Sequence, residues 1–156
     1  MIVVDTSVLV DFFRGRETEA VRAFRQIELD EAPFSIPGIC CQEVLQGAAD
    51  AREWRSLLSY LETQSLVFPR DAWATHVSAA RIYFDCRRRG VTLRGTLDCY
   101  IAQLVLETRG VLLHDDDDYD YIKEVRPLRT LLESSSRRRR HAPGRGRPGQ
   151  PTSMTR

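Results

Sequence analysis

Short apolar runs that alternate with helical segments constrain the fold of this chain more than any other feature of its sequence. The runs lie at residues 2–4, 34–36, 66–68 and 111–113, each short enough to be a buried strand. Apolar residues recur at helical spacing in the segments between the runs, at 6–13, 17–28, 37–46, 50–62, 72–89 and 96–109. Thr6 or Ser7 can open the first helix, and Thr96 can cap the last. The alternation predicts an α/β fold with a mainly parallel sheet.

The length and charge of the chain predict one domain followed by a basic tail. The chain has 156 residues, and its net charge of +1 hides an asymmetry between its two parts. Residues 134–156 hold seven Arg and no acid, which leaves residues 1–133 with 16 basic and 22 acidic groups, a net charge of −6. The tail is rich in Arg, Pro, Gly and Ser, so we expect it to be disordered. It would serve as an electrostatic tether for RNA or simply as a solvated extension.

Neither a membrane span nor a secretory segment is visible in the sequence. No apolar run approaches the ~18 residues of a transmembrane helix, and the N-terminus lacks a basic region followed by a long apolar stretch. We therefore expect a cytoplasmic protein. The four cysteines, Cys40, Cys41, Cys86 and Cys99, form no Cys-x-x-Cys pair and are predicted to be reduced core residues.

Acidic residues follow two of the predicted strands. Asp5 comes directly after residues 2–4, and an acidic run at 115–118 follows residues 111–113. In open parallel sheets, ligands bind beyond the carboxyl ends of the strands, where both would lie. Asp98 falls in the first turn of a helix, where the helix dipole alone would favour it. Glu43 is either a solvated helix residue or a member of the same site, since its side of the helix also carries Cys40 and Val44.

A cluster of these acids predicts a cation site. Two carboxylates ~5 Å apart repel by about 3 kcal/mol at an effective dielectric of 20. Four such groups persist together only by taking up protons or by binding a cation. A set of oxygen ligands favours Mg2+ or Mn2+ over zinc.

Four short motifs, in this order, resemble the PIN domain family, particularly the VapC-type toxins of bacterial toxin–antitoxin pairs. The first is VVDTSVLVD at residues 3–11, and the second is IP at 36–37 followed by EVLQG at 43–47. The third is TLD at 96–98 followed by IA at 101–102, and the fourth is LLHDDDDY at 112–119. The family has Thr-x-Asp-x-Asp-Phe in the fourth motif, so His114 and Tyr119 depart from it. The resemblance covers residues 1 to about 133, which leaves the tail outside it.

The resemblance implies a three-layer α/β/α sandwich and an endoribonuclease that depends on Mg2+, with Mn2+ as the alternative ion. It implies that Asp5, Asp98 and Asp116 are metal ligands and that Glu43 holds a metal-bound water or a second metal. Thr6 would be the hydroxyl beside the first acid that supports the site. Asp118 matches a second acid of the fourth motif. Because Asp115 and Asp117 add further charge, the fourth acid is Asp116 or a neighbour.

The resemblance also implies an RNA substrate, a cognate VapB-like antitoxin and a homodimer. The metal would polarise the phosphate and activate a water for in-line attack, which gives products with a 5′-phosphate and a 3′-hydroxyl. Arginines that precede Asp98 would steer the RNA backbone towards the acidic body; they are Arg81, Arg87, Arg88, Arg89 and Arg94. Alternatively, residues 87–89 only complement the C-terminus of a helix.

The sequence disagrees with two other functions and leaves a third open. A haloacid-dehalogenase-type phosphotransferase needs a second Asp two residues after the first, where this chain has Ser7. A calcium loop starting at Asp116 fails because Tyr121 stands in place of its turn glycine and Pro127 in place of its closing Glu. A non-catalytic PIN-fold module that binds RNA or a partner protein remains open, and metal-dependent RNA cleavage distinguishes the enzyme from it.

Overall fold

The computed structural model describes residues 1–134, so the predicted tail, except its first residue Ser134, lies outside the described residues. The elements alternate between strands and helices along the chain, as predicted. In order they are β1 Ile2–Val4, α1 Thr6–Phe13, α2 Glu19–Leu29, β2 Phe34–Pro37, α3 Gly38–Gln46, α4 Ala51–Leu61, β3 Leu66–Val67, α5 Ala72–Arg88, α6 Leu97–Glu107, β4 Val111–Leu113 and α7 Asp118–Ile122. Within this part of the chain, no helix has the length and apolarity needed to cross a bilayer.

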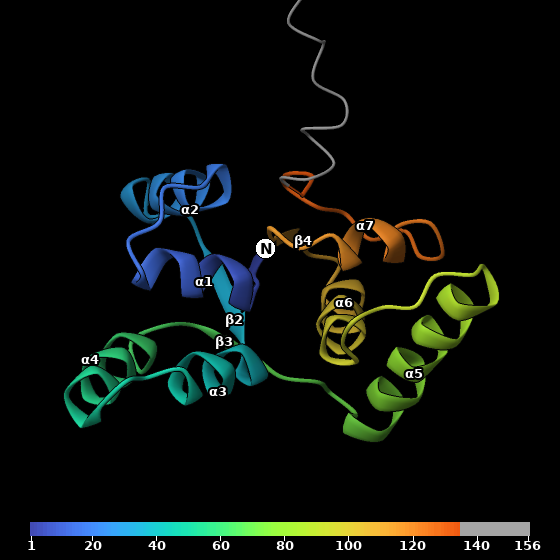
Figure 1. The fold of residues 1–156 in the computed structure, drawn as a ribbon, viewed down its shortest axis with the longest axis horizontal. Coiled ribbons are helices and arrows are strands. Elements are labelled where there is room, and N and C mark those ends of the chain that lie inside the picture. Colours follow the sequence, from blue (N-terminus) through green and yellow to red (C-terminus); the bar gives the residue numbers. More distant parts are fainter. Residues whose placement is uncertain (135–156) are drawn as a thin grey trace, which may run out of the picture.

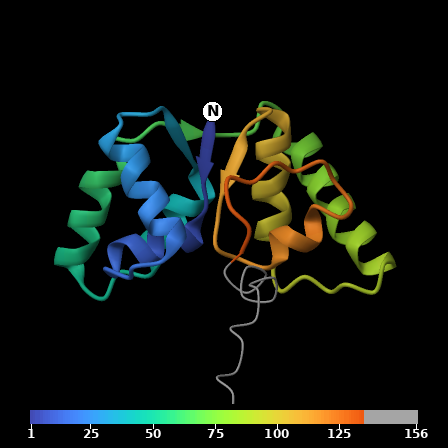
Figure 2. The same ribbon diagram turned by 90° about the horizontal axis from the view of Figure 1, so that it is seen from above.

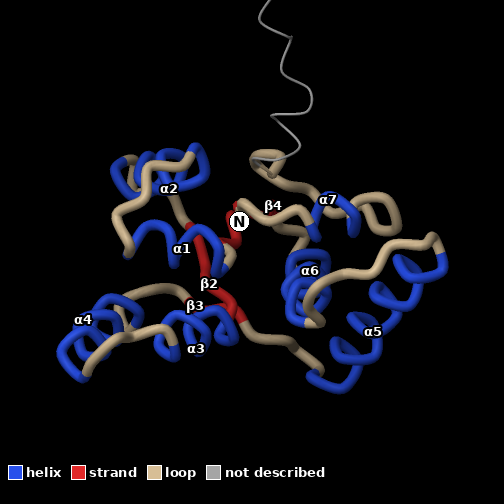
Figure 3. The backbone as a smooth tube through the Cα atoms, in the orientation of Figure 1, coloured by secondary structure: helices blue, strands red, loops and turns tan. Residues whose placement is uncertain are grey.

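The strands form one parallel sheet with the order β3-β2-β1-β4. Ile2 pairs with Phe34 of β2 on one side and with Val111 of β4 on the other, so β1 is a central strand. Figures 1 and 2 show α1 to α4 on one face of the sheet and α5 to α7 on the other, and Figure 3 shows the strands between them. The predicted three-layer α/β/α sandwich is therefore confirmed.

The core lies where both helical layers meet β1 and its neighbour β4. Val3 and Val4 of β1 and Leu112 and Leu113 of β4 are fully buried. Helices cover both faces of these strands, which is why each strand reads as an apolar run rather than as an alternation. Cys40, Cys86 and Cys99 are buried and all four cysteines are free, as predicted.

The carboxyl edge of the sheet gathers segments that are distant in sequence. Because the strands are parallel, β1, β2 and β4 all end at this edge, at Asp5, at the start of α3 and at His114 respectively. Helix α6 runs back across the sheet into β4, so its first turn, with Asp98, lies at the same edge. The loop 89–96 connects the end of α5 to that turn, and Gly90 begins it with a φ of 81°.

The helix ends at this edge agree only in part with the predictions. Helix α1 begins at Thr6, as predicted, and its N-cap is Asp5, whose carboxylate accepts from the backbone N–H of Ser7. Thr96 precedes α6 but makes no side-chain capping bond. The segment after β4 was not predicted as helical, yet Asp118 begins α7.

The domain extends to the last described residue. Ser134 is fully buried, and its hydroxyl donates to the carboxylate of Asp120 at 2.5 Å. The first residue of the predicted tail therefore packs against α7.

Candidate active site

Asp5 is the most enclosed carboxylate of the predicted cluster. It is 3% exposed, and its backbone N–H donates to the carbonyl of Leu113 on β4. Its Oδ2 accepts from the backbone N–H and the hydroxyl of Ser7, at 2.9 and 2.6 Å. Its Oδ1 accepts from the hydroxyl of Tyr119 at 2.6 Å. A carboxylate offers about four lone-pair positions, so three donors leave one open, on Oδ1.

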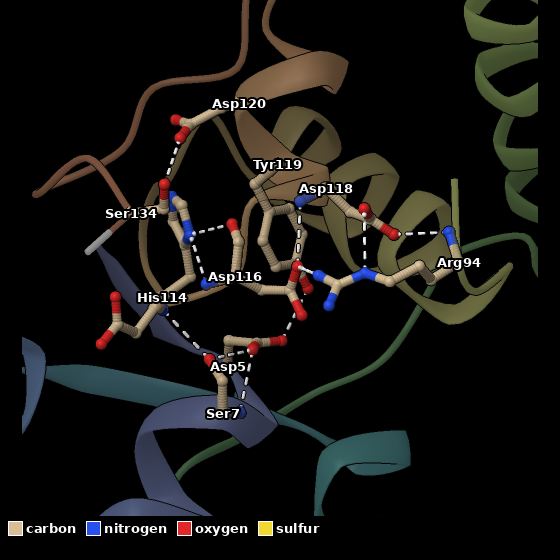
Figure 4. A network of polar contacts seen from close by, with 10 residues as sticks. Asp5, Ser7, Arg94, His114, Asp116, Asp118, Tyr119, Asp120 and Ser134 are labelled. Atoms are coloured by element: carbon tan, nitrogen blue, oxygen red, sulfur yellow. Dashed lines mark hydrogen bonds and ion pairs between the residues drawn. The ribbon is translucent and has the colours of Figure 1, made fainter. Parts of the chain in front are cut away.

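Two hydrogen bonds attach Asp5 to the segment that follows β4. The hydroxyl of Ser7 donates to Asp5 and accepts from the backbone N–H of Asp115 at 3.1 Å. Tyr119 reaches Asp5 from α7 and is fully buried. Figure 4 shows the Tyr119 ring above Asp5, with Asp116 beside them. These bonds fix the acidic segment relative to the first strand.

Glu43 is held from the first helix. The hydroxyl of Thr6 donates to Glu43 Oε2 at 2.6 Å, a bond that joins α1 to α3. Thr6 thus lies beside Asp5 in the chain and holds a second acid of the predicted set, while its supporting role stays a prediction. Cys40 lies one turn before Glu43, and burial, with Asp5 and Glu43 nearby, raises the pKa of its thiol.

Asp98 is the acid on which the charges of the others converge. Burial, and then repulsion by Asp5, Asp116, Asp118 and Glu43, together raise its pKa from 3.8 to about 7. Gly95 lies against it, since a Cβ at that position would stand 3.3 Å from Asp98 Oδ2. Asp98 therefore lies near all of the other predicted acids.

Arg94 lies between the two acids of the fourth motif. Its backbone N–H donates to Asp118 Oδ2 at 2.7 Å, its Nε donates to Asp118 Oδ1 at 3.3 Å, and its Nη2 pairs with Asp116 Oδ1. Asp118 is 4% exposed in its side chain and Arg94 68%, so the acid is buried and the cation open to solvent. Figure 4 shows the guanidinium reaching both carboxylates. The backbone N–H of Asp118 also donates to Asp116 Oδ1, at 2.9 Å.

His114 and Tyr119, the two departures from the family pattern, pack against each other. Their ring centroids are 4.7 Å apart and both side chains are fully buried. Burial lowers the pKa of His114, so the imidazole is neutral. Its Nδ1 lies 3.0 Å from the carbonyl oxygen of Asp116, while Nε2 has no hydrogen-bond partner among residues 1–134. His114 is thus a packing partner of Tyr119.

The residues fit a divalent cation in donor chemistry. Burial and the repulsion between the carboxylates hold the pKa of Asp98 near 7, and a cation would relieve the repulsion. As the side chains stand, no three His, Cys, Asp or Glu groups among the described residues lie close enough together to hold an ion. Two of the carboxylates have other partners: Asp5 accepts from Ser7 and Tyr119, and Asp116 pairs with Arg94.

The other predicted RNA-binding arginines lie apart from this cluster. Arg81, Arg87 and Arg88 are on the last two turns of α5, around Phe84. Among the predicted arginines, only Arg94 contacts the acids of the site. The positions of Ser7 and Tyr119 were not predicted. One indication of the bond between Tyr119 and Asp5 was present in the sequence: Tyr119 stands where the family has Phe, and its hydroxyl is an additional hydrogen-bond donor.

A comparison with protein families matches residues 2–125 to the PIN domain. The chain belongs to the PIN domain family. Among curated proteins it is similar to VapC ribonuclease Mb1587 of Mycobacterium bovis and to ribonuclease VapC11 of Mycobacterium tuberculosis. Each is 31% identical over 129 residues, which cover 82% of this chain and 96% of the relative. This PIN domain is therefore of the VapC type.

Solved structures share the fold. VapBC-1 from nontypeable Haemophilus influenzae matches with a TM-score of 0.63 at 18% identity and covers 83% of this chain and 96% of the matched chain. VapBC2 from Rickettsia felis, bound to a DNA fragment from its promoter, matches with a TM-score of 0.62 at 14% identity over 83% and 97% of the chains. At these identities the similarity establishes the fold alone.

Proposed function

We propose that this VapC-type PIN domain is a metal-dependent endoribonuclease and the toxin of a type II toxin–antitoxin pair. The observation that carries the proposal is the convergence of four carboxylates on Asp98 at the carboxyl edge of the sheet. A site with that charge attracts a cation, and a cation among carboxylates attracts a phosphodiester. The similarity to VapC ribonucleases over most of the chain supports RNA as the substrate.

Asp5, Asp98 and Asp116 would hold the ion, Mg2+ or Mn2+. When bound, the ion would polarise the scissile phosphate and lower the pKa of an attacking water. Asp5 would offer Oδ1, because Ser7 occupies both lone pairs of Oδ2. Asp116 would exchange its bond to Arg94 for the ion.

Arg94 would then contact the substrate. Asp118 holds Arg94 through the backbone N–H and Nε, two bonds that do not involve Asp116. Release of Asp116 therefore frees Nη2 without releasing the side chain, and the planar fork can bind the scissile phosphate. In this proposal Asp118 positions Arg94 and is not a metal ligand.

Glu43 would accept the proton of the attacking water. Thr6 donates to Oε2 and so fixes the side chain. Oε1 accepts no hydrogen bond from any residue between 1 and 134, which leaves it open to the substrate side. A carboxylate in hydrogen-bond reach of the nucleophile acts as a general base.

A VapB-like antitoxin and a second copy of the chain would be the protein partners. The solved VapBC complexes share the fold, which supports the first. The second is supported by a hollow of about 630 Å3 between α3, α5 and α6, lined by Ile39, Tyr83 and Tyr100 among others. Phe68, which also lines the hollow, and Trp73 of α5 are large exposed side chains, and aromatic surface of this kind is enriched at subunit interfaces. Light scattering after gel filtration measures the oligomeric state.

Asp5→Asn tests the proposed function. RNA cleavage by the wild type should require Mg2+ or Mn2+ and stop in EDTA. The variant should lose more than about 100-fold in rate, since changes one shell outside a metal site already cost about 10- to 100-fold. Asp11→Asn is the matched control, because Asp11 lies on the same helix and pairs with Arg16 on the surface.

The result also separates the enzyme from a non-catalytic PIN-fold module. A wild-type protein that binds RNA but cleaves none with either ion would contradict the proposal. An Asp5→Asn protein that cleaves as the wild type would contradict the role of Asp5. Urea unfolding of both variants identifies any loss of activity that comes from unfolding.

A further inference from the structure

The last turns of α5 carry arginines around a partly exposed aromatic ring. Phe84 is 38% exposed, although it lies next to the buried Cys86. The guanidinium carbons of Arg81, Arg87 and Arg88 lie 5.2, 6.0 and 5.9 Å from the centre of its ring. Cation–π attraction at these distances holds the three side chains near the ring.

The segment that follows α7 adds one arginine to the same region and is joined to α5 and its C-cap by two hydrogen bonds. A hollow of about 460 Å3 is lined by Arg81, Asp85, Arg88, Arg89, Val125 and Arg126. Arg126 follows α7 and donates to Asp85 at 2.8 Å, and Arg89 donates to the backbone carbonyl of Glu124 at 2.6 Å. We call this region the α5 arginine surface; it consists of Phe84 with Arg81, Arg87, Arg88, Arg89 and Arg126.

The charge of this surface is opposite to that of the domain. Asp85 is the acid within it, and Arg126 and Arg81 beside it lower the pKa of its carboxyl, so it stays ionised. Arg87 and Arg88 form no hydrogen bond or ion pair with any side chain of the described chain, and both are exposed. Residues 1–133 carry −6 overall. With five arginines and one acid, the α5 arginine surface is therefore positively charged on a domain whose net charge is negative.

The helix dipole does not account for this arrangement. It favours cations within the last turn, which covers Arg87 and Arg88. Arg81 lies about two turns from the end of α5, and Arg126 belongs to another segment. Arginines from two segments that converge on one hollow are instead suited to a polyanion, because a guanidinium binds phosphate with two parallel N–H bonds.

We propose that the α5 arginine surface binds the phosphate backbone of the RNA substrate outside the cleavage site. The proposal rests on the proposed ribonuclease function. The loop 89–96 leads from this surface directly to Arg94 and Asp98, and Figures 1 and 2 show it running from the end of α5 to the first turn of α6. One RNA strand bound at the α5 arginine surface would thus pass towards the acids that would cleave it.

Removing the two arginines that lack acidic partners tests the surface. The double variant Arg87→Ala/Arg88→Ala should bind fluorescein-labelled bulk transfer RNA about 20-fold more weakly at 0.1 M salt, in EDTA so that no cleavage occurs. The slope of log K against log salt should flatten by about 1.4, since each phosphate contact to a single strand contributes about 0.7. Fluorescence anisotropy measures both.

Arg52→Ala/Arg55→Ala is the matched control. It removes the same charge from two exposed positions of α4, which Figure 1 shows on the opposite side of the molecule from α5. The control should change RNA affinity less than about twofold, because its arginines would make no phosphate contact. Equal losses in the two double variants would mean that net charge alone matters, and would overturn the proposal.

Cleavage kinetics give a second readout. With Mg2+, Arg87→Ala/Arg88→Ala should raise KM for transfer RNA and leave kcat unchanged, because the surface does not touch the reacting atoms. A fall in kcat at unchanged KM would overturn the proposal. If the wild type cleaves no RNA, the ribonuclease function fails, whereas the anisotropy measurement still decides whether this surface binds RNA.

Phe84→Leu examines how the arginines are held. Leucine keeps an apolar side chain at this position but removes the ring face over which three guanidinium groups lie. RNA affinity should fall several-fold, less than in the double arginine variant. Circular dichroism should report the same helix content in all variants, since the changed side chains are exposed.

Discussion

Replacement of Asp98 by Asn should stabilise the metal-free protein at neutral and higher pH. The carboxyl is ionised with difficulty, because burial and four neighbouring carboxylates raise its pKa from 3.8 to about 7. A shift of that size costs the folded state about 4 kcal/mol once the group is ionised in both states. Asn removes the charge and keeps the shape. The substitution removes no hydrogen bond within residues 1–134, because no group among these residues donates to the Asp98 carboxylate.

The sign of the pH dependence of stability follows from the pH at which Asp98 loses its proton in the folded and in the unfolded state. Between about pH 4 and 7 the folded state retains the proton that the unfolded state has lost. The contribution of Asp98 to stability is therefore complete below pH 4 and is lost as the pH rises to 7. The advantage of Asp98→Asn over the wild type should be about 4 kcal/mol at pH 8, about 1.5 kcal/mol at pH 5 and about 0.5 kcal/mol at pH 4.

Urea unfolding in EDTA measures this difference. Trp54 and Trp73 are partly exposed and provide the fluorescence signal. Glu62→Gln is the control, because it neutralises an exposed acid at the end of α4 and should change stability by less than about 0.5 kcal/mol. Mg2+ should stabilise the wild type at pH 8 and have little effect on Asp98→Asn, because the variant has lost one of the proposed ligands.

Two results would refute the reasoning. Asp98→Asn could be no more stable than the wild type at pH 8, which would mean that the carboxylates do not repel at this position. Alternatively, its advantage could be the same at pH 5 and pH 8, which would mean that it comes from packing rather than from charge.

Three further outcomes are expected. Tyr119→Phe should lower the free energy of unfolding in EDTA by about 1.5–3 kcal/mol, because the hydrogen bond to Asp5 is lost. The loss should be smaller in Mg2+, where the ion would contact the same oxygen of Asp5, and equal losses would contradict the assignment of Asp5 Oδ1 as the ligand atom. Asp118→Asn should reduce kcat/KM about tenfold and leave Mg2+ affinity within about twofold in calorimetry. Arg94→Ala should reduce kcat/KM by a similar factor that does not add to that of Asp118→Asn, but it should tighten Mg2+ binding in the absence of RNA, because Asp116 loses its competing guanidinium. An ion affinity that falls in Asp118→Asn would instead make Asp118 a ligand. Truncation after Ser134 should leave the cleavage position in RNA unchanged, because all of the proposed site residues precede Ser134. Sequencing of the 5′ ends of the products measures the position, and a moved cleavage site would show that residues 135–156 position the substrate.

The fold could be predicted because its signals are local. An apolar run such as residues 2–4 and the helical spacing of 72–89 each carry their own evidence, and alternation of the two selects a parallel sheet. Helix α7 was missed for a related reason. Asp118–Ile122 has five residues with acids in its first turn, too short for a periodic pattern, and its burial against α6 comes from tertiary packing.

The site could be predicted only in its residue types. The motifs placed Asp5, Glu43, Asp98 and Asp116, and the structure brings their charges together at Asp98, while their roles as ligands stay predictions. The hydrogen bonds around them could not be predicted from spacing. Tyr119 is 114 positions from Asp5, and nothing in a local pattern connects them.

Arg94 explains how ion and substrate binding would depend on each other in this site. The guanidinium pairs with Asp116 Oδ1, so an ion that takes this oxygen would displace it, which lowers the affinity for the ion. The same displacement presents Nη2 to the RNA while Asp118 keeps the rest of the side chain in place. A phosphate that binds the released guanidinium removes the competitor for Asp116. The two affinities are then linked, and by reciprocity the factor by which Mg2+ tightens RNA binding equals the factor by which RNA tightens Mg2+ binding.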